Sequence, residues 1–462
     1  MTQRSTWQAN KNEVVAQNGV VTSMQPQSAE AGLSILQQGG NAVDAAVAMG
    51  FCNVVLEPYM AVIGGMGYML VHMAAEGRTV GVDFNGRAPR QAQADMFDVI
   101  GPAPPGGIQV YRTRDDANID GALSITVPAT CAGFCAVHER FGVLSLEQVL
   151  EPAIGLACDG FETNWHTTLY VANKFDELTA DPYLAAMWLP GGRPPRSYPK
   201  PAERIVQRDL GGLLRRIAKQ GAAGMYQGEV ANAIADWMQE NGGLLTRQDL
   251  VDYQPLFGQP LQQTFRDATI ACVATPSGAV TNQETFSILN HLDLDHAPYN
   301  SADYLHIVIE AARHAFADRF RYLGDWQHTP VPLQGMLSPA YTQMVAALIT
   351  SDASKTAIVD AAEPWSYYLD HALHDPWAFD PASPATALPF PALAAEAGAT
   401  THINVVDKDR NAVSCTHTGV FNSVHPYHTG AYLTHGMAWF IPLPGHANSI
   451  AGWKRPMNNM CP

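Results

Sequence analysis

The sequence predicts a large globular protein in which helices are combined with β-hairpins. Its 462 residues are 47% hydrophobic and 15% charged, a composition that supports a sizeable core and excludes a disordered chain. Some segments repeat their apolar residues at the period of a helix, and others alternate apolar and polar residues as a strand does. At about 150 residues per domain, this length allows two or three domains or one large unit.

Charge, hydropathy and cysteine content limit the partners and the compartment. Lys and Arg number 27 against 43 Asp and Glu, a net charge of −16 without a basic stripe, which excludes nucleic acids and anionic membranes as partners. The polar N-terminus lacks the apolar region of a secretory signal, and the longest apolar stretch, residues 42–56, is too short for a spanning helix. The seven cysteines form no CxxC pair and indicate reduced thiols. We therefore expect a cytoplasmic protein, or a periplasmic or secreted one if a signal peptide has been removed.

In the first half of the chain, local patterns predict helices and a pair of strands. The glycine pair 39–40 ends the first helix, and the glycine-rich turn at 64–67 separates the second helix from the strands. Ser145 and Gln148 have the spacing of a capping box, and Pro152 is expected to kink or divide the helix that follows. The predicted helices span residues 28–38, 41–55 and 145–159, the strands 68–72 and 78–84, and a Pro- and Gly-rich loop 101–107.

In the second half, a long irregular segment separates helices from a final hairpin. Residues 361–399 are rich in Pro and Ala and have neither helical nor strand periodicity, which is typical of a functional loop or a linker. The next residues are regular, because 401–407 and 412–418 alternate as two strands around a tight turn at 408–411. Before the irregular segment we expect a loop at 190–201, two helices within 209–239, a strand at 264–274 and a helix at 301–320.

Thr400 and Thr401 stand at the junction between the irregular segment and the hairpin. A threonine hydroxyl inside a chain is a weak nucleophile, but at a chain N-terminus its own α-amine serves as general base. A flexible segment that ends in a small residue, followed by Thr400, fits a site of self-cleavage. On spacing alone, a threonine that simply begins a strand is the more common explanation.

Blocks of sequence along the whole chain resemble the γ-glutamyltranspeptidase family of N-terminal-nucleophile hydrolases. They include GGNAVDAAV at 39–47, the glycine turn at 64–67 and TTHINVVD at 400–407, and the others lie at 127–133, 241–246, 249–253, 310–319, 322–325 and 454–457. This resemblance implies an α+β fold, a four-layer αββα sandwich with two central antiparallel sheets. It also implies that no metal or organic cofactor is required.

The resemblance further implies a reaction and a division of the chain. Thr400 aligns with the nucleophile, and Thr418 with a second threonine that hydrogen-bonds the nucleophile's amine. Self-cleavage between Ala399 and Thr400 would give a large-subunit region, 1–399, and a small-subunit region that begins with 400–462. The implied reaction is hydrolysis or transfer of an acyl group from a small amide substrate, through an acyl-enzyme.

The residues expected to recognise the substrate depart from the family pattern. Asn85 replaces an arginine that clamps the α-carboxylate, and Arg87, two positions on, is a candidate replacement. The other changes place Val420 at an asparagine position, Trp439 at an aspartate position, and Asn458 and Asn459 at a serine pair. A tryptophan ring offers an ammonium group only a weak cation–π contact. We therefore expect an oxamate-like or other carboxylated amide without an α-amine, with a true γ-glutamyltransferase or glutathione hydrolase as the alternative.

Cys461 and Pro462 end the sequence inside a block that continues in the family, ahead of the glycine pair that forms the oxyanion hole. Each lost oxyanion donor costs ~10²–10³ in rate. We therefore expect a truncated small-subunit region, or else a catalytically inactive member of the family that acts as a binding protein.

Histidines near the end of the chain raise two further possibilities. One is zinc binding by a cluster of His417, His425, His428 and His435, although histidines on strand and loop surfaces are more common. The other concerns His402, which shares the face of Thr400 if the strand is regularly pleated there.

Overall fold

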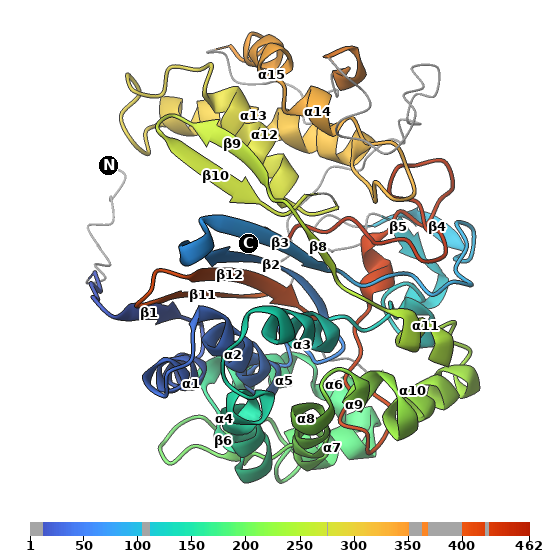
Figure 1. The fold of residues 1–462 in the computed structure, drawn as a ribbon. Helices are drawn as coiled ribbons and strands as arrows, with labels where there is room; N and C mark the ends of the chain where they lie inside the picture. The colour runs from blue at the N-terminus through green and yellow to red at the C-terminus, as the bar shows by residue number, and fades with distance from the viewer. Residues whose placement is uncertain (1–12, 104–110, 275, 351–362, 368–399, 421–424) are drawn as a thin grey trace, which may run out of the picture.

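Four layers of secondary structure are stacked in the protein. The computed structural model describes residues 13–103, 111–274, 276–350, 363–367, 400–420 and 425–462. Within these ranges a helical layer is followed by a large antiparallel sheet, a two-stranded sheet and a second helical layer, as Figure 1 shows from bottom to top. This order confirms the α+β sandwich expected from the sequence.

The large sheet brings the two predicted hairpins together. Its described strands, in spatial order, are β1 (Gly19–Thr22), β11 (Thr401–Asp407), β12 (Ala412–Thr418), β2 (Met66–Met73), β3 (Arg78–Phe84) and β8 (Leu256–Gly258). Thr418 of β12 pairs with Met66 of β2, and Gly67 of β2 pairs with Phe84 of β3. The beginnings of β11 and β2 therefore lie at the same end of the sheet as the last residues of β12 and β3.

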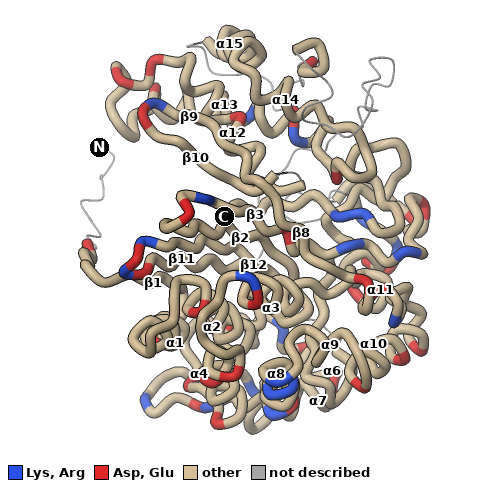
Figure 2. The backbone as a smooth tube through the Cα atoms, viewed as in Figure 1, with Lys and Arg blue, Asp and Glu red and all other residues tan. Residues whose placement is uncertain are grey.

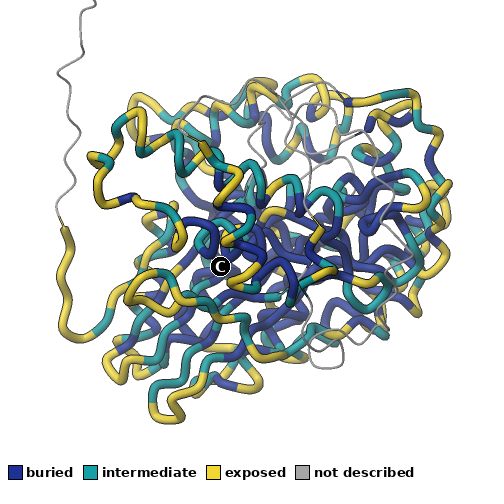
Figure 3. The backbone as a smooth tube through the Cα atoms, turned by 90° about the horizontal axis from the view of Figure 1, so that it is seen from above, coloured by how far each residue is buried: buried dark blue, intermediate teal, exposed yellow. Residues whose placement is uncertain are grey.

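Helices cover the lower face of this sheet and enclose the main core. They are α1 (Pro26–Gln37), α2 (Ala42–Leu56), α3 (Thr130–Phe141), α4 (Leu146–Asp159), α5 (Trp165–Asn173), α6 (Phe175–Ala180), α7 (Pro182–Trp188), α8 (Arg208–Gln220), α9 (Ala223–Tyr226), α10 (Gly228–Glu240) and α11 (Arg247–Asp252). Every residue of α2 is buried, because this apolar helix lies between the sheet and the helices α1, α3 and α4. Figure 3 shows the buried residues gathered in the interior, with exposed residues along the outer turns.

A smaller unit covers the other face of the sheet. It consists of β9 (Leu261–Phe265), β10 (Ala268–Cys272), α12 (Ala279–Leu289), α13 (Ala302–Tyr322), α14 (Leu333–Met336) and α15 (Pro339–Ala346). Its helices form their own small core around Ile288, Ala315 and Tyr341. The remaining short elements are the strand pairs β4 (Val99–Pro102) with β5 (Tyr111–Thr113) and β6 (Phe161–Glu162) with β7 (Arg204–Ile205), and the 3₁₀ helices η1 (Ala74–Glu76), η2 (Arg114–Asp116), η3 (Ala122–Ser124), η4 (Pro364–Tyr367) and η5 (Gly436–Trp439).

Helix α4 confirms one local prediction and corrects another. Ser145 and Gln148 form the expected capping box, with the Ser145 side chain accepting from the Gln148 N–H. Of the two expected effects of Pro152, division of the helix is wrong, since α4 runs without a break from Leu146 to Asp159. Packing of α4 against both α2 and α8 holds the helix together around the hydrogen bond that proline cannot make.

The strand expected at 264–274 is wrong, because this stretch spans a hairpin. β9 ends at Phe265 and β10 begins at Ala268. Arg266 between them has a φ of 55°, in the left-handed region, and turns the chain back on itself. Arg266 and Asp267 are two consecutive charged residues between the alternating stretches, and this local break in the pattern marks the reversal.

Two more expectations are corrected in detail. Residues 209–239 take part in three helices rather than two, since Gly221 and Gly228 have positive φ values and set the short helix α9 apart. The loop expected at 101–107 begins as the end of β4, and its residues from 104 onward lie outside the described part of the chain.

Part of the sequence analysis falls on residues that the structure does not describe. The irregular segment 361–399 lies outside the described residues apart from 363–367, and Ala399 on the predicted cleavage bond lies outside them too. The seven cysteines are all described and all free. Among the described helices, none has the length and hydropathy needed to cross a membrane.

Candidate active site

Two threonines meet at the end of the large sheet. Thr400 precedes β11, Thr418 is the last residue of β12, and the pairing of Thr401 with His417 places the two threonines opposite each other. Thr400 Oγ1 donates a hydrogen bond to Thr418 Oγ1 over 3.2 Å. The structure thus brings together the two threonines that the sequence analysis paired.

The pleat of this hairpin determines which side chains share a face with Thr400. Thr401 points toward the helical layer, where its Oγ1 accepts a hydrogen bond of 3.4 Å from Asn53 Nδ2 of α2. Alternate side chains, including those of Thr400 and His402, therefore occupy the opposite face. On that face, His402 Nδ1 lies 2.7 Å from Thr416 Oγ1. The expectation that His402 shares the face of Thr400 is confirmed.

A buried carboxyl group lies behind the start of β11. Glu57, just after α2, accepts a hydrogen bond of 3.0 Å from Gln25 Nε2. Burial raises the pKa of Glu57, and hydrogen bonds from Thr401 and Gln25 oppose that rise. Hydrogen bonds to Glu57 and Asn53 therefore hold Thr401 against the helical layer, and they fix the backbone next to the candidate nucleophile Thr400.

The glycine turn at 64–67 allows the end of β12 to approach the start of β2. A Cβ atom on Gly65 would lie 2.1 Å from the carbonyl oxygen of Thr418, which no side chain tolerates. The carbonyl oxygen of Gly65 accepts hydrogen bonds from the N–H groups of Ala129 and Thr130, at 2.9 and 3.0 Å. The turn therefore joins the site to the N-terminus of α3, and only glycine fits at its centre.

Two of the predicted recognition residues meet around a tyrosine. Asn85 Nδ2 donates to Tyr68 OH at 2.9 Å and to the Pro456 carbonyl at 2.7 Å, and Asn458 Nδ2 donates to the same phenol at 3.2 Å. All three side chains are buried, and burial raises the pKa of Tyr68 well above its usual value. Since Tyr68 pairs with Thr416 in the sheet, this cluster lies one strand away from the threonine hairpin.

Arg87 is held by the protein itself. Its guanidinium donates to the Trp453 carbonyl at 2.8 Å and to Gln327 Oε1 at 3.1 Å, and it lies over the Trp453 ring. Burial lowers the pKa of Arg87, and the neighbouring Arg455 lowers it further. The structure therefore directs this guanidinium toward residues 327 and 453, and gives no support to the hypothesis that it clamps a substrate carboxylate.

The other predicted recognition residues make contacts of their own within the protein. Val420 lies two residues beyond the end of β12, and its N–H donates a hydrogen bond of 3.2 Å to Thr434 Oγ1. Trp439 ends η5, its carbonyl accepts from Asn448 Nδ2 at 2.7 Å, and its half-buried ring packs against the main core. The side chain of Asn459 is exposed, and its backbone lies against Gly278.

An ion triad that the sequence analysis missed supports this end of the sheet. Arg455 donates through Nη1 to Asp83, and through Nη2 and Nε to Asp325 at 2.5 and 3.2 Å. Burial opposes the ionisation of Asp325, but hydrogen bonds from His328 and Arg455 outweigh it and hold its pKa far below the usual value. The same two carboxylates raise the pKa of Arg455 against the effect of burial.

Two members of the triad come from blocks that carry the family resemblance, and the third precedes Asn85. Asp83 begins the stretch that leads to Asn85, Asp325 ends the block 322–325, and Arg455 lies in the block 454–457. The triad therefore fixes the chain on both sides of Asn85 and next to Asn458. Charged residues in two of these blocks and beside Asn85 are the signal from which the triad could have been found.

The histidines do not assemble a metal site. His417 is buried with neither ring nitrogen hydrogen-bonded, and burial lowers its pKa to about 3. His425 Nε2 lies 3.0 Å from Asp181 Oδ2, and burial lowers the pKa of His435 to about 4. Within the described residues, no group of three or more histidine, cysteine or carboxylate side chains could hold a metal ion. The zinc alternative is therefore not supported.

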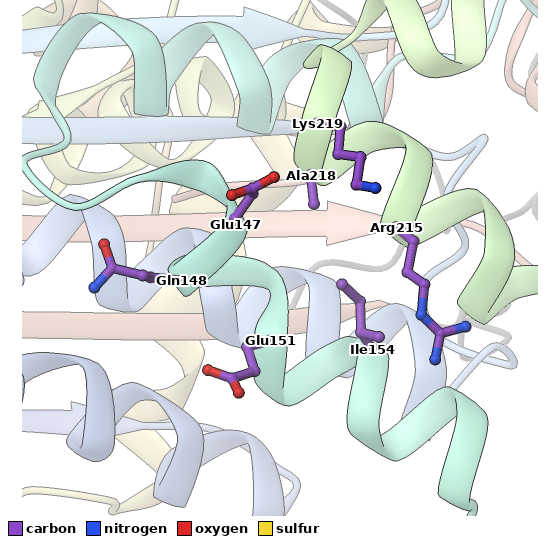
Figure 4. Close-up of a pocket in the computed structure, with 7 residues that line it drawn as sticks. All are labelled: Glu147, Gln148, Glu151, Ile154, Arg215, Ala218 and Lys219. Atoms are coloured by element: carbon purple, nitrogen blue, oxygen red, sulfur yellow. The ribbon is translucent and has the colours of Figure 1, made fainter.

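Two concave regions of the described structure have no lining residue from the threonine strands β11 and β12. Figure 4 shows a groove of about 350 Å³ between α4 and α8, lined by Glu147, Gln148, Glu151, Ile154, Arg215, Ala218 and Lys219. Its basic residues, Arg215 and Lys219, belong to α8, on which Figure 2 shows Lys and Arg positions in blue, and none of its lining residues comes from the threonine end of the sheet. A second cavity of about 300 Å³ borders Asp83 and Arg455 and is otherwise lined mainly by apolar residues of β8, β9 and α14. Its polar end is the ion triad.

The family model and two similar proteins point to the same protein family. The Gamma-glutamyltranspeptidase family model matches residues 28–462. An Acylase ACY 1 proenzyme of a Pseudomonas species is 34% identical over 457 residues, which are 98% of this chain and 75% of the relative. A Glutathione hydrolase proenzyme of Escherichia coli is 31% identical over 471 residues, covering 97% of this chain and 73% of the relative.

Solved structures agree with the sequence relatives. The γ-glutamyltranspeptidase of Helicobacter pylori superimposes with a TM-score of 0.66 at 30% identity, over 74% of this chain and 94% of that one. A cephalosporin acylase from Bacillus halodurans gives a TM-score of 0.79 at 24% identity, over 99% of this chain and 77% of that one, and shares the fold.

Proposed function

Because the chain belongs to the gamma-glutamyltranspeptidase family of amidohydrolases and acyltransferases, we propose that it is a self-cleaving enzyme whose nucleophile is Thr400. Cleavage of the bond between Ala399 and Thr400 gives a large subunit, 1–399, and a small subunit that begins at Thr400. Relatives that are named as proenzymes support this division. The observation that carries the proposal is the hydrogen bond of 3.2 Å from Thr400 Oγ1 to Thr418 Oγ1.

After cleavage, the site supplies its own base. The α-amine of Thr400 takes the proton of the Thr400 hydroxyl as the oxygen attacks the amide carbonyl, and returns it to the departing amine. Thr418 orients this hydroxyl, and Gly65 and Glu57 hold the two strand ends that carry the pair. Water or a second amine then takes the acyl group from Thr400.

We propose that the acyl group lacks an α-amine. The aspartate position of the γ-glutamyl enzymes is Trp439, which accepts no hydrogen bond from an ammonium group. The acylase relatives favour such a substrate, and the glutathione hydrolase relatives favour the γ-glutamyl alternative. An oxamate-like or other carboxylated amide requires a carboxylate partner other than Arg87, since Arg87 is engaged with residues 327 and 453.

Intact mass of freshly purified protein tests the nucleophile. The wild type is expected to give two fragments split between Ala399 and Thr400, and the Thr400→Ala variant a single chain. A single chain from both proteins would refute self-cleavage and favour the alternative of an inactive family member that binds small amides.

A substrate panel tests the specificity. Oxamate, glutaryl amides, γ-glutamyl-p-nitroanilide and glutathione are compared on the cleaved protein and on its Trp439→Asp variant. Hydrolysis of the amides without an α-amine, with γ-glutamyl turnover gained by the variant, is the expected result. Efficient γ-glutamyl turnover by the wild type would establish the alternative, a γ-glutamyltransferase.

A further inference from the structure

Self-cleavage at Thr400, on which this inference rests, needs a base that the mature site does not provide. Before cleavage the nitrogen of Thr400 belongs to a peptide bond, and its lone pair is delocalised into the carbonyl group. The α-amine that serves as base in later turnovers does not yet exist. The proton of the Thr400 hydroxyl must therefore go to another group during the first reaction.

Among the described residues of β11 and β12, the pleat leaves one basic side chain on the face of Thr400. The residues of these two strands that face away from α2, together with Thr400, are His402, Asn404, Val406, Ala412, Ser414, Thr416 and Thr418. Of these, only His402 has a basic side chain, an imidazole whose unprotonated ring nitrogen can accept a proton. Cys415 and His417 are buried on the opposite face of β12, toward α2. Glu57 lies on the same α2 side of β11, and β1 contributes no titratable residue.

A row of hydroxyl groups leads from Thr400 toward this histidine. Thr400 Oγ1 donates to Thr418 Oγ1 at 3.2 Å, so its proton points toward β12. Two positions back on the same face, Thr416 Oγ1 lies 2.7 Å from His402 Nδ1. The other nitrogen, His402 Nε2, lies 3.1 Å from the Asn404 side-chain oxygen, an acceptor that requires the proton on Nε2. His402 Nδ1 therefore has its lone pair directed at Thr416.

We propose that His402 receives the Thr400 proton in the self-cleavage reaction, through Thr416 and one water molecule between the hydroxyls of Thr416 and Thr418. Side chains two positions apart on a strand are about 6.7 Å apart. Two hydrogen bonds through one water span about 5.5 Å, a distance that threonine rotamers can bridge. The half-buried position of His402 leaves its ring accessible to that water.

The proton and the bonds balance over the complete step. The Thr400 oxygen bonds to the carbonyl carbon of Ala399 while its proton passes along the row to His402. The bond from that carbon to the Thr400 nitrogen then breaks, and the nitrogen takes the proton back from the imidazolium as it becomes an amine. Water afterwards hydrolyses the ester between Ala399 and Thr400, leaving a carboxylate on Ala399 and the free hydroxyl on Thr400.

The same sheet contains a matched control. His72 Nδ1 lies 2.9 Å from Thr79 Oγ1, a second histidine–threonine pair on the β2–β3 hairpin. His72 pairs with Ala412, at the end of β12 remote from Thr418. If these histidines only stabilised the sheet, replacing His402 and replacing His72 would affect the rate of self-cleavage to the same extent.

The test follows self-cleavage of newly translated full-length chains by intact mass against time. Replacing His402 by Gln is expected to slow cleavage by ~10²-fold, within the range that general bases contribute. His72→Gln is expected to cleave at the wild-type rate. His402→Gly is expected to be slow and to be accelerated by added imidazole, which fills the space left by the ring.

Thr416 supplies a second test that leaves the histidine in place. Thr416→Ser keeps the hydroxyl and is expected to cleave as the wild type does, whereas Thr416→Val is expected to be as slow as His402→Gln. If His402→Gly fails to fold, the comparison of Thr416→Ser with Thr416→Val tests the proton route instead. Wild-type rates in His402→Gln, or equal rates in the two Thr416 variants, would overturn the proposal while self-cleavage itself stands. If the wild type does not cleave at Thr400, the proposed function and this inference fall together.

Discussion

The ion triad of Arg455, Asp83 and Asp325 allows a quantitative prediction about stability. The Asp325 and Arg455 side chains are 0% and 2% exposed, so Asp325→Asn leaves a buried guanidinium short of one carboxylate. Breaking a buried ion pair in this way costs about 3–5 kcal/mol. The matched control is Asp98→Asn. Asp98 and Arg114 form an ion pair of 2.6 Å, but their side chains are 59% and 65% exposed. This substitution is therefore expected to leave stability unchanged.

Urea unfolding at pH 7, followed by tryptophan fluorescence, measures both variants in a Thr400→Ala background so that a single chain is compared. The pKa of Asp325 is lower in the folded than in the unfolded state, so its contribution is complete above about pH 4 and is lost as the pH falls further. The difference between Asp325→Asn and its parent should therefore shrink below pH 4. Equal unfolding midpoints for Asp325→Asn and Asp98→Asn would refute the reasoning.

Two further predictions concern the site and its surroundings. A Cβ on Gly65 would lie 2.1 Å from the Thr418 carbonyl, whereas one on Gly81 would meet nothing closer than 3.6 Å. Gly65→Ala should therefore cost about 1–3 kcal/mol and slow self-cleavage, and Gly81→Ala should do neither, as denaturation and intact mass can show. Burial lowers the pKa of His417 to about 3, so the folded chain loses stability as the pH falls from about 6.5 toward 3 and the unfolded chain takes up the proton. His417→Leu should flatten this part of the stability curve, and an unchanged slope would contradict it.

Local structure in this chain follows from short stretches of sequence. The capping box of Ser145 and Gln148 and the hairpin at 401–418 depend on neighbours a few residues away, and both are found where the pattern predicts them. Pairing of Thr400 with Thr418 follows from the same hairpin, because the length of the turn sets the register. The hairpin of β9 and β10 is local too, since the chain reverses at Arg266, whose φ is positive.

The surroundings of the site depended on the tertiary structure. Arg87 is a plausible carboxylate clamp in the sequence, but the folded chain places its guanidinium against residues 327 and 453. Neither these partners nor the contact of Asn85 with the Pro456 carbonyl can be inferred from local patterns, because more than 200 residues separate the groups.

The sequence by itself determined the candidate nucleophile, its threonine partner and the class of fold. The tertiary structure decided that Asn85 and Asn458 meet at Tyr68 and that Arg87 is already engaged. The physical reason is that buried polar groups must find hydrogen-bond partners wherever packing brings them. Helices and hairpins form from neighbours along the chain, but those partners come from segments that only the complete fold places together.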